Sequence, residues 1–281
     1  MLVKMKSRLI VMLIAGGFLV TPVITWADKK QPLHDALGQA PVVLAIYPDT
    51  SAIPVNVLRF YIRFSKPMQE MGILTHIRLR DQDGTDMTGV FFENQHELWN
   101  KDRTEVTLIV DPGRVKTGLA AHQAIGRAFE EGKRYELTVD KGLLDFHDRE
   151  LAQNYTKQFV AVAEDVTAPQ LLRWQVTTPS VQSRMALKID FHDNIDHLSA
   201  ASYIKVLRDK REISGDVRLS KHGQVWSFTP KASWQKGGYQ IVVNPQLEDI
   251  AANSLDQVFD HDVADYKNKK QVAAHINFKV Q

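Results

Sequence analysis

One cluster of side chains has the composition of a metal site. His192, Asp193 and His197 stand where a predicted strand ends and a loop begins, and imidazole and carboxylate groups that meet in a turn can bind a metal ion. The same residues also suit a simple polar turn, in which Asp side chains bond the backbone. His192, Asp193 and His197 are therefore the candidate metal ligands, with a structural turn as the alternative.

A second candidate is a pair of cations at the end of another predicted strand. Arg114 and Lys116 are two residues apart and follow Asp111-Pro112-Gly113. Two neighbouring cations can hold an anion such as a carboxylate or a phosphate. Their aliphatic stems can instead cover apolar surface while the charges stay in water. The pair is the candidate anion- or ligand-binding site.

The common catalytic signatures are missing from the sequence. The chain has no cysteine, which excludes a thiol nucleophile and disulfides, and it has no G-x-S-x-G, H-E-x-x-H or P-loop pattern. Its 35 basic and 33 acidic residues nearly balance, at a net charge of +2, so nucleic acid is not an expected partner. The sequence predicts a protein that is not an enzyme and has no cofactor.

The first 27 residues read as a cleavable export signal. Cations precede the apolar run Leu9–Val20, and the small residues Thr25 and Ala27 predict a cut before Asp28. The run is shorter than the roughly 20 residues of a spanning helix. We therefore expect an exported protein, periplasmic or extracellular, with no membrane span after cleavage.

Alternating apolar and polar residues predict mostly strands after the signal. In Asn56–Phe64 the apolar residues Leu58, Phe60, Ile62 and Phe64 alternate with Arg59, Tyr61 and Arg63, which is typical of a half-buried strand. A single helix is predicted over Leu119–Glu131, ending at Gly132, and the lack of a βαβ pattern argues against parallel sheets. Similar patterns predict strands over Ile73–Leu79, Glu105–Val110, Tyr135–Val139, Phe159–Val162, Met185–Phe191, Tyr203–Leu207, Val225–Phe228, Tyr239–Val243 and Ala274–Val280.

The order of these signals repeats once along the chain. Residues 28–40 read as a flexible leader, 41–163 as a first domain and 164–281 as a second, which begins with the linker Glu164–Pro169. Two units of this size with several short strands each are typical of sandwiches. The predicted fold class is all-β, with two tandem Ig-like antiparallel β-sandwich domains after a cleaved signal peptide.

Short motifs at turns carry a family resemblance. Phe64-Ser65-Lys66-Pro67-Met68 resembles the F-S-x-P-M signature of bacterial Ig-like domains of the S-layer (SbsA) type. Asp249-Ile250-Ala251-Ala252-Asn253 is similar to the D-x-A-G-N turn of such domains, with Ala252 in place of glycine. The resemblance implies a secreted, non-catalytic module that serves surface layers or adhesion.

The leading hypothesis is a non-catalytic binding, adhesive or structural module, whose partner is an unknown protein or glycan of the cell envelope. Sugars could stack on Trp99, Trp174, Trp226 and Trp234, although tryptophans in sandwich proteins usually pack in the core. One alternative is a metal-binding protein like periplasmic copper carriers, although the first His after the predicted cut is His34. Another is a hydrolase with Arg114, Asp193 and nearby carboxylates at the domain junction.

Overall fold

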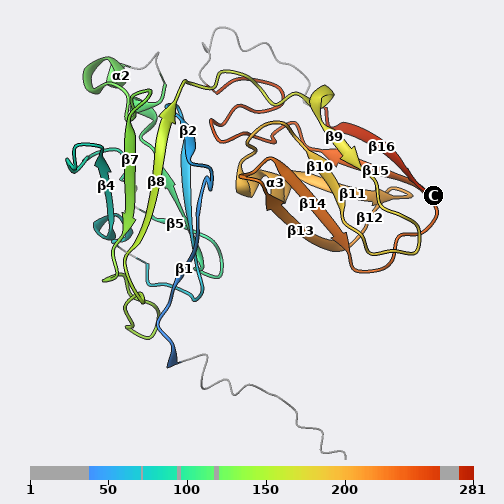
Figure 1. Ribbon diagram of the computed structural model, residues 1–281, viewed down its shortest axis with the longest axis horizontal. Coiled ribbons are helices and arrows are strands. Elements are labelled where there is room, and N and C mark those ends of the chain that lie inside the picture. Colours follow the sequence, from blue (N-terminus) through green and yellow to red (C-terminus); the bar gives the residue numbers. More distant parts are fainter. Residues whose placement is uncertain (1–37, 71, 94–95, 117–119, 260–271) are drawn as a thin grey trace, which may run out of the picture. The chain divides into compact units, whose positions relative to one another are not determined.

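The computed structural model describes residues 38–281 except 71, 94–95, 117–119 and 260–271 (Figure 1). The predicted signal and nearly all of the predicted leader lie outside the described residues. Residues Ala40–Gln281 form one compact unit. Its described part contains four sheets of four strands each, two from each half of the chain, which confirms the all-β, tandem Ig-like sandwich. The domain limits at 163/164 stay a prediction.

The first sandwich packs two sheets around one apolar core. Phe60 and Ile62 from one sheet and Leu137 and Phe159 from the other are almost fully buried. The first sheet has the order β1 (Val43–Tyr47), β3 (Arg59–Phe64), β6 (Glu105–Ile109), β5 (Leu98–Trp99), and the second β2 (Ala52–Pro54), β8 (Tyr155–Val162), β7 (Arg134–Val139), β4 (Ile77–Asp81).

The second sandwich repeats this plan around its own core. Trp226 and Trp234 lie in its centre, and Trp174 is also buried, so these three tryptophans serve packing as core residues do. One sheet has the order β13 (Gly215–Ser220), β14 (Val225–Pro230), β10 (Leu187–Asp190), β9 (Gln175–Thr177), and the other β12 (Arg211–Glu212), β11 (Ile204–Arg208), β15 (Gly237–Val243), β16 (Ala274–Val280).

Two predicted elements are wrong in part. The predicted strand Ile73–Leu79 begins as the 3-10 helix η1 (Ile73–His76), because Gly72 has a φ of 92° and the Thr75 hydroxyl donates to its carbonyl. Within the described part of the helix predicted over Leu119–Glu131, which excludes Leu119, the helical residues are those of α2 (Ala120–Ile125). It stops at Gly126, whose φ is 70°.

Further helices were not predicted. They are α3 (His197–Tyr203) and the 3-10 turns η2 (Pro112–Arg114) and η3 (Leu171–Arg173). Within the described part of the chain, no helix is both long and apolar enough to cross a bilayer.

One strand pair contradicts the expectation of purely antiparallel sheets. β2 pairs with β8 in parallel, with Ala52 opposite Val160 and Pro54 opposite Val162. The pair needs no crossover helix of its own, because β2 is a three-residue edge strand that joins β8 from far away in the chain. The expectation failed because it considered only strands that follow each other.

The repeat is clearest at two matching turns. Met68 bridges to Asp145, and Ile195 bridges to Asp249, at the same point of each sandwich. Each aspartate accepts from the backbone N–H groups two and four residues later. Ala252 forms its turn with a φ of 64°, as glycine would, so the substitution noted in the motif leaves the turn intact.

Gly215 is required by close packing of the edge strand β13. A Cβ there would lie 2.3 Å from the Phe228 ring and 2.7 Å from the Thr229 carbonyl oxygen. We expect Gly215→Ala to destabilise the fold by about 1–3 kcal/mol, as overpacking does. Gly238→Ala is the control, since its Cβ would meet nothing within 4 Å. Urea denaturation measures both, and equal midpoints for the two variants would contradict the packing argument.

Candidate functional site

The three predicted metal ligands have different partners in the structure. His192 is exposed, and its Nδ1 lies 3.6 Å from Asp190 Oδ1. Asp193 accepts from the Asn194 backbone N–H, whereas His197 Nε2 lies 3.2 Å from Glu105 Oε2 in the first sandwich. Among the described residues no group of three His, Asp or Glu side chains is arranged to hold a metal ion.

The predicted anion-binding cations have separate partners. The Arg114 guanidinium donates to the carbonyl oxygens of Thr88 and Gly89, at 3.4 and 3.2 Å. The Lys116 ammonium lies 4.3 Å from the centre of the Phe259 ring. These contacts suit the alternative in which both stems cover neighbouring surface, and the anion site stays a prediction.

A buried carboxyl group lies where the two sandwiches meet. Asp196 caps helix α3, because its Oδ1 accepts from the Ser199 N–H at 2.9 Å. Its Oδ2 accepts from the Tyr61 hydroxyl of β3 at 2.7 Å. Burial raises the pKa of both groups. The carboxylate of Asp196 raises the pKa of Tyr61 further, whereas the bond donated by the Tyr61 hydroxyl opposes the rise at Asp196. One carboxyl therefore starts a helix and joins it to the other sandwich.

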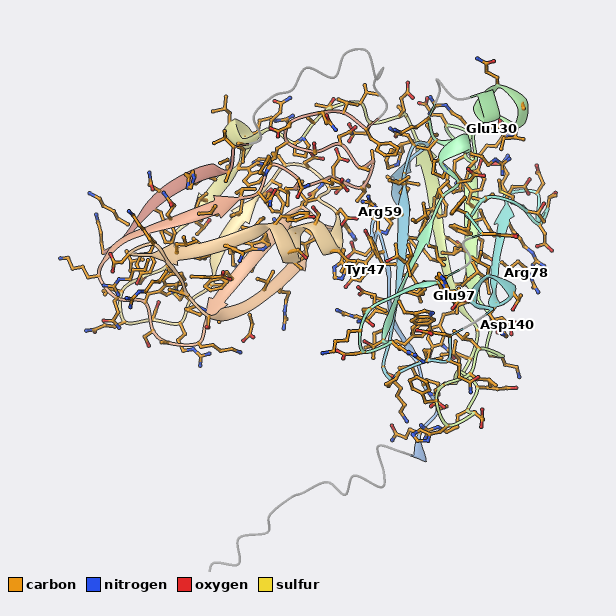
Figure 2. All side chains as sticks on the ribbon, turned by 180° about the vertical axis from the view of Figure 1, so that it is seen from behind. Tyr47, Arg59, Arg78, Glu97, Glu130 and Asp140 are labelled. Carbon is orange, nitrogen blue, oxygen red and sulfur yellow. The ribbon has the colours of Figure 1, made fainter. Side chains whose placement is uncertain are left out.

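Two further pairs flank this bond. The His197 ring stacks on Tyr47 with 3.9 Å between centroids and 6° between planes, while its Nε2 faces Glu105. Arg59 donates to Glu248 Oε2 at 2.5 Å. Figure 2 shows Tyr47 and Arg59 on one face of the first sandwich, with Arg78 on the opposite face. We call Tyr47, Arg59, Tyr61, Glu105, Asp196, His197 and Glu248 the junction cluster.

The predicted linker is bonded on both sides. The Asn56 side chain donates to the Asp165 carbonyl and accepts from its N–H, at 2.8 and 2.9 Å. The Asn253 side chain of the second sandwich donates to the same carbonyl at 3.0 Å. Backbone joins backbone where Leu58 donates to the Ile250 carbonyl at 3.4 Å. These bonds explain why residues on both sides of the linker belong to one compact unit.

Buried carboxyl groups gather behind the linker. Burial raises the pKa of Asp193 to about 6, and the nearby charge of Asp165 adds to the shift. Burial also raises the pKa of Asp249 to about 8, against the bonds donated by Asn253. Asp165 and Asp193 line a hollow of about 200 Å³ that also includes Arg173. Protonated Asp193 could act as an acid, but no activated nucleophile stands with it among these lining residues.

The matching turn of the first sandwich has the opposite electrostatics. Burial alone would raise the pKa of Asp145, but the bond from the Arg149 side chain and those from the backbone N–H groups lower it. At Asp249 the place of Arg149 is taken by the neutral Asn253. The same backbone geometry thus holds an ionised carboxylate in one sandwich and favours a protonated one in the other.

The junction leaves little room for a substrate. Its cavity measures about 20 Å³ and is lined by Tyr47, Tyr61, Asp196 and His197, among others. A single water needs roughly 10–15 Å³ of such space. The groups that could serve acid–base chemistry are thus packed against one another, and the residues of the predicted hydrolase site, Arg114 and Asp193, have no partner in common among their described bonds.

The sequence patterns missed Tyr61, Glu105 and Asp196 as site residues. Tyr61 was expected on the polar face of its strand, yet only 3% of it is exposed. The available signal was Asp196-His197-Leu198-Ser199, in which an Asp can bond the N–H three residues on and begin a helix. No local signal in β3 marks the residue that this helix meets.

Comparison with known proteins adds no family. No protein-family model matches the chain, and no curated protein matches it. These results leave the structure itself as the basis for the class of protein, which is a tandem Ig-like β-sandwich protein.

Solved structures resemble the chain only distantly. Alpha-2-macroglobulin from Escherichia coli, in a fragment spanning domains MG0-NIE-MG1, is 10% identical over 75% of this chain and 68% of that one, with a TM-score of 0.29. This chain spans 13% of the whole macroglobulin. Domains 5–6 of the S-layer protein SbsC are 9% identical over 85% and 98%, with a TM-score of 0.24. Scores of this size support no statement about function.

The first test of the junction removes one hydroxyl. Tyr61→Phe leaves Asp196 Oδ2 buried without its donor, which we expect to cost about 1–3 kcal/mol in the free energy of unfolding. Tyr155→Phe is the control, because no bond to the Tyr155 hydroxyl is found among the described residues. Thermal and urea unfolding compare the two, and a Tyr61→Phe chain as stable as the control would refute the role of this bond.

The matched turns predict opposite pH dependence. An unfolded Asp titrates near pH 4, and folded Asp249 near 8, so its contribution to stability is complete below about pH 4 and is lost as the pH rises towards 8. Asp249→Asn should flatten this loss, by up to about 1.4 kcal/mol per pH unit. Folded Asp145 has a lowered pKa, so its contribution is lost as the pH falls below about 4.

The measurement is the free energy of unfolding between pH 3 and 9. Asp145→Asn serves as the matched variant, because it changes the same atom in the same kind of turn. It should remove stability at neutral pH and leave the loss of stability between about pH 4 and pH 8 as it is. An unchanged slope for Asp249→Asn would show that Asp249 is ionised in the folded protein.

Proposed function

We propose that this chain is an exported, non-catalytic binding or structural module of the cell envelope, with its two Ig-like sandwiches held together as one body. The observation that carries the proposal is the junction cluster. Tyr61, Glu105, Asp196 and His197 are the kinds of residue that build active sites, and here they bond or stack across the two sandwiches. A rigid pair of sandwiches suits a spacer or a binding surface.

The finer proposal is that both sandwiches are Ig-like domains of the surface-layer type. The motif residues support it through their positions: Met68 is fully buried and bridges to the Asp145 turn. Motif and repeat thus form one structural unit in each half. The partner in this proposal is a protein or glycan of the envelope, reached after removal of residues 1–27.

Neither alternative function gains support from a specific contact. Among the described residues no group of three His, Asp or Glu side chains is arranged to hold a metal ion, and the junction offered to a hydrolase is filled by its own side chains. Heat on titration of the purified chain with copper or zinc would favour metal binding, and the hydrolysis assay below tests the other alternative.

The test follows the chain into the envelope. Expressed with a C-terminal tag in a bacterium with two membranes, the chain should leave the cell on osmotic shock and begin at Asp28 by N-terminal sequencing. It should hydrolyse no ester, phosphate or glycoside substrate above the level of Asp193→Asn. A chain that stays in the cytoplasm, or an activity that Asp193→Asn abolishes, would overturn the proposal.

A further inference from the structure

Each sandwich carries a hollow at the same place. The hollow of the first sandwich is about 860 Å³ and that of the second about 570 Å³. The first lies over β7 and β8 beside the end of β4, and the second over β15 and β16 beside the end of β11. In each sandwich the hollow covers an antiparallel strand pair whose first strand has a third strand, β4 or β11, on its other side, although β8 is flanked by β2 and β16 is an edge strand. The hollows therefore lie over corresponding strand pairs.

The two strand pairs align residue by residue. Tyr135 faces Phe159, and Tyr239 faces Phe278 in the strand register. Both pairs stack, with centroids 5.5 and 5.4 Å apart and planes at 27° and 21°. Both tyrosine hydroxyls also accept from a backbone N–H of the preceding loop. This buried pair fixes which outward residues correspond.

The next outward pair is hydrogen-bonded across the strands in both sandwiches. Gln158 Nε2 donates to Glu136 Oε2 at 3.0 Å, and Gln240 Nε2 donates to Asn277 Oδ1 at 3.0 Å. Each pair presents planar amide or carboxyl groups on the floor of its hollow. Such groups both donate to and accept from hydroxyls, which is the chemistry that recognises sugars.

The outward row on the other side of the tyrosine carries a cation in both sandwiches. Arg134 stands opposite Val160, and Lys279 stands opposite Gly238. The cation is on the earlier strand in one case and on the later strand in the other, yet it occupies the same row. Neither Arg134 nor Lys279 has an ion-pair partner in the described part of the chain. A Cβ at Gly238 would meet nothing within 4 Å, so open space lies next to Lys279 in the second hollow.

We propose that the two hollows bind units of an acidic polysaccharide, with a sugar carboxylate on Arg134 or Lys279 and sugar hydroxyls on the neighbouring hydrogen-bonded pair. The inference rests on the proposed function as an envelope-binding module and names its ligand class.

Charge complementarity favours an acidic sugar, because the carboxylates that line the hollows already have partners. In the first hollow Asp81 accepts from two backbone N–H groups and Glu136 accepts from Gln158, while Arg80 is paired with Asp86. In the second hollow Asp209 lies 3.7 Å from Arg208, which leaves Lys210 and Lys279 without an ion pair among the described residues. Two equivalent sites on one body suit a ligand that repeats along a chain.

The experiment titrates the chain, as purified from expressing cells, with a short alginate oligomer at low salt in a calorimeter. The expected result is two sites per chain. Arg134→Glu and Lys279→Glu should each remove one site, and the double variant should weaken binding at least about tenfold. Lys188→Glu is the control: it makes the same charge change on an exposed residue of β10, in the other sheet.

The remaining arms separate the rival outcomes. A neutral dextran should give no heat, and a glutamate peptide should bind more weakly than alginate, because it lacks the hydroxyls. Equal binding of the peptide would overturn the sugar chemistry, and equal weakening by Lys188→Glu would reduce the binding to diffuse charge. No heat with alginate would rule out the two hollows as binding sites, while export and the lack of hydrolysis would still support the proposed function.

Discussion

The structure depends on the bond between Tyr61 and Asp196. A buried carboxyl needs hydrogen-bond donors, because a polar group without a hydrogen bond in the protein interior destabilises the folded state. Asp196 receives them from its own helix and from the other sandwich. Separation of the sandwiches would leave one carboxyl oxygen without its donor and would expose the stacked rings of Tyr47 and His197. Asp196 therefore couples the start of α3 to the contact between the sandwiches, so that a change at one affects the other.

The strands could be predicted from the sequence because each depends on its own alternation. In β16 every second residue turns inward, and the structure keeps that pattern. Predictions failed where a partner distant in sequence decides the outcome. Tyr61 is polar by its place in the alternation but is buried by a helix 135 residues later. The helix predicted around α2 fails for a related reason: Ala128 and Phe129 are drawn into the core, which the turn at Gly126 makes possible.

The two aspartate turns show how a repeat keeps its geometry while its electrostatics change. Backbone N–H groups define the turn at Asp145 and at Asp249, and they fix the position of the carboxyl. The charge of that carboxyl depends on the fifth residue of the turn, which is Arg149 in one sandwich and Asn253 in the other. Asn253 is needed for another task, since its amide also holds the linker at Asp165. The turn that holds the linker thus loses the cation that its counterpart keeps.

This division bears on where a ligand can bind. The face of β3 is used by the junction, and its polar groups are occupied by partners from the second sandwich. The outward face of the other sheet contributes no residue to the junction cluster. There Arg134, which has no ion-pair partner in the described part of the chain, lies near the hydrogen-bonded pair Glu136 and Gln158. The second sandwich uses the matching face in the same way, although its residues differ at every outward position. A pattern kept through different residues indicates that the arrangement of groups, more than any one side chain, is what the repeat preserves.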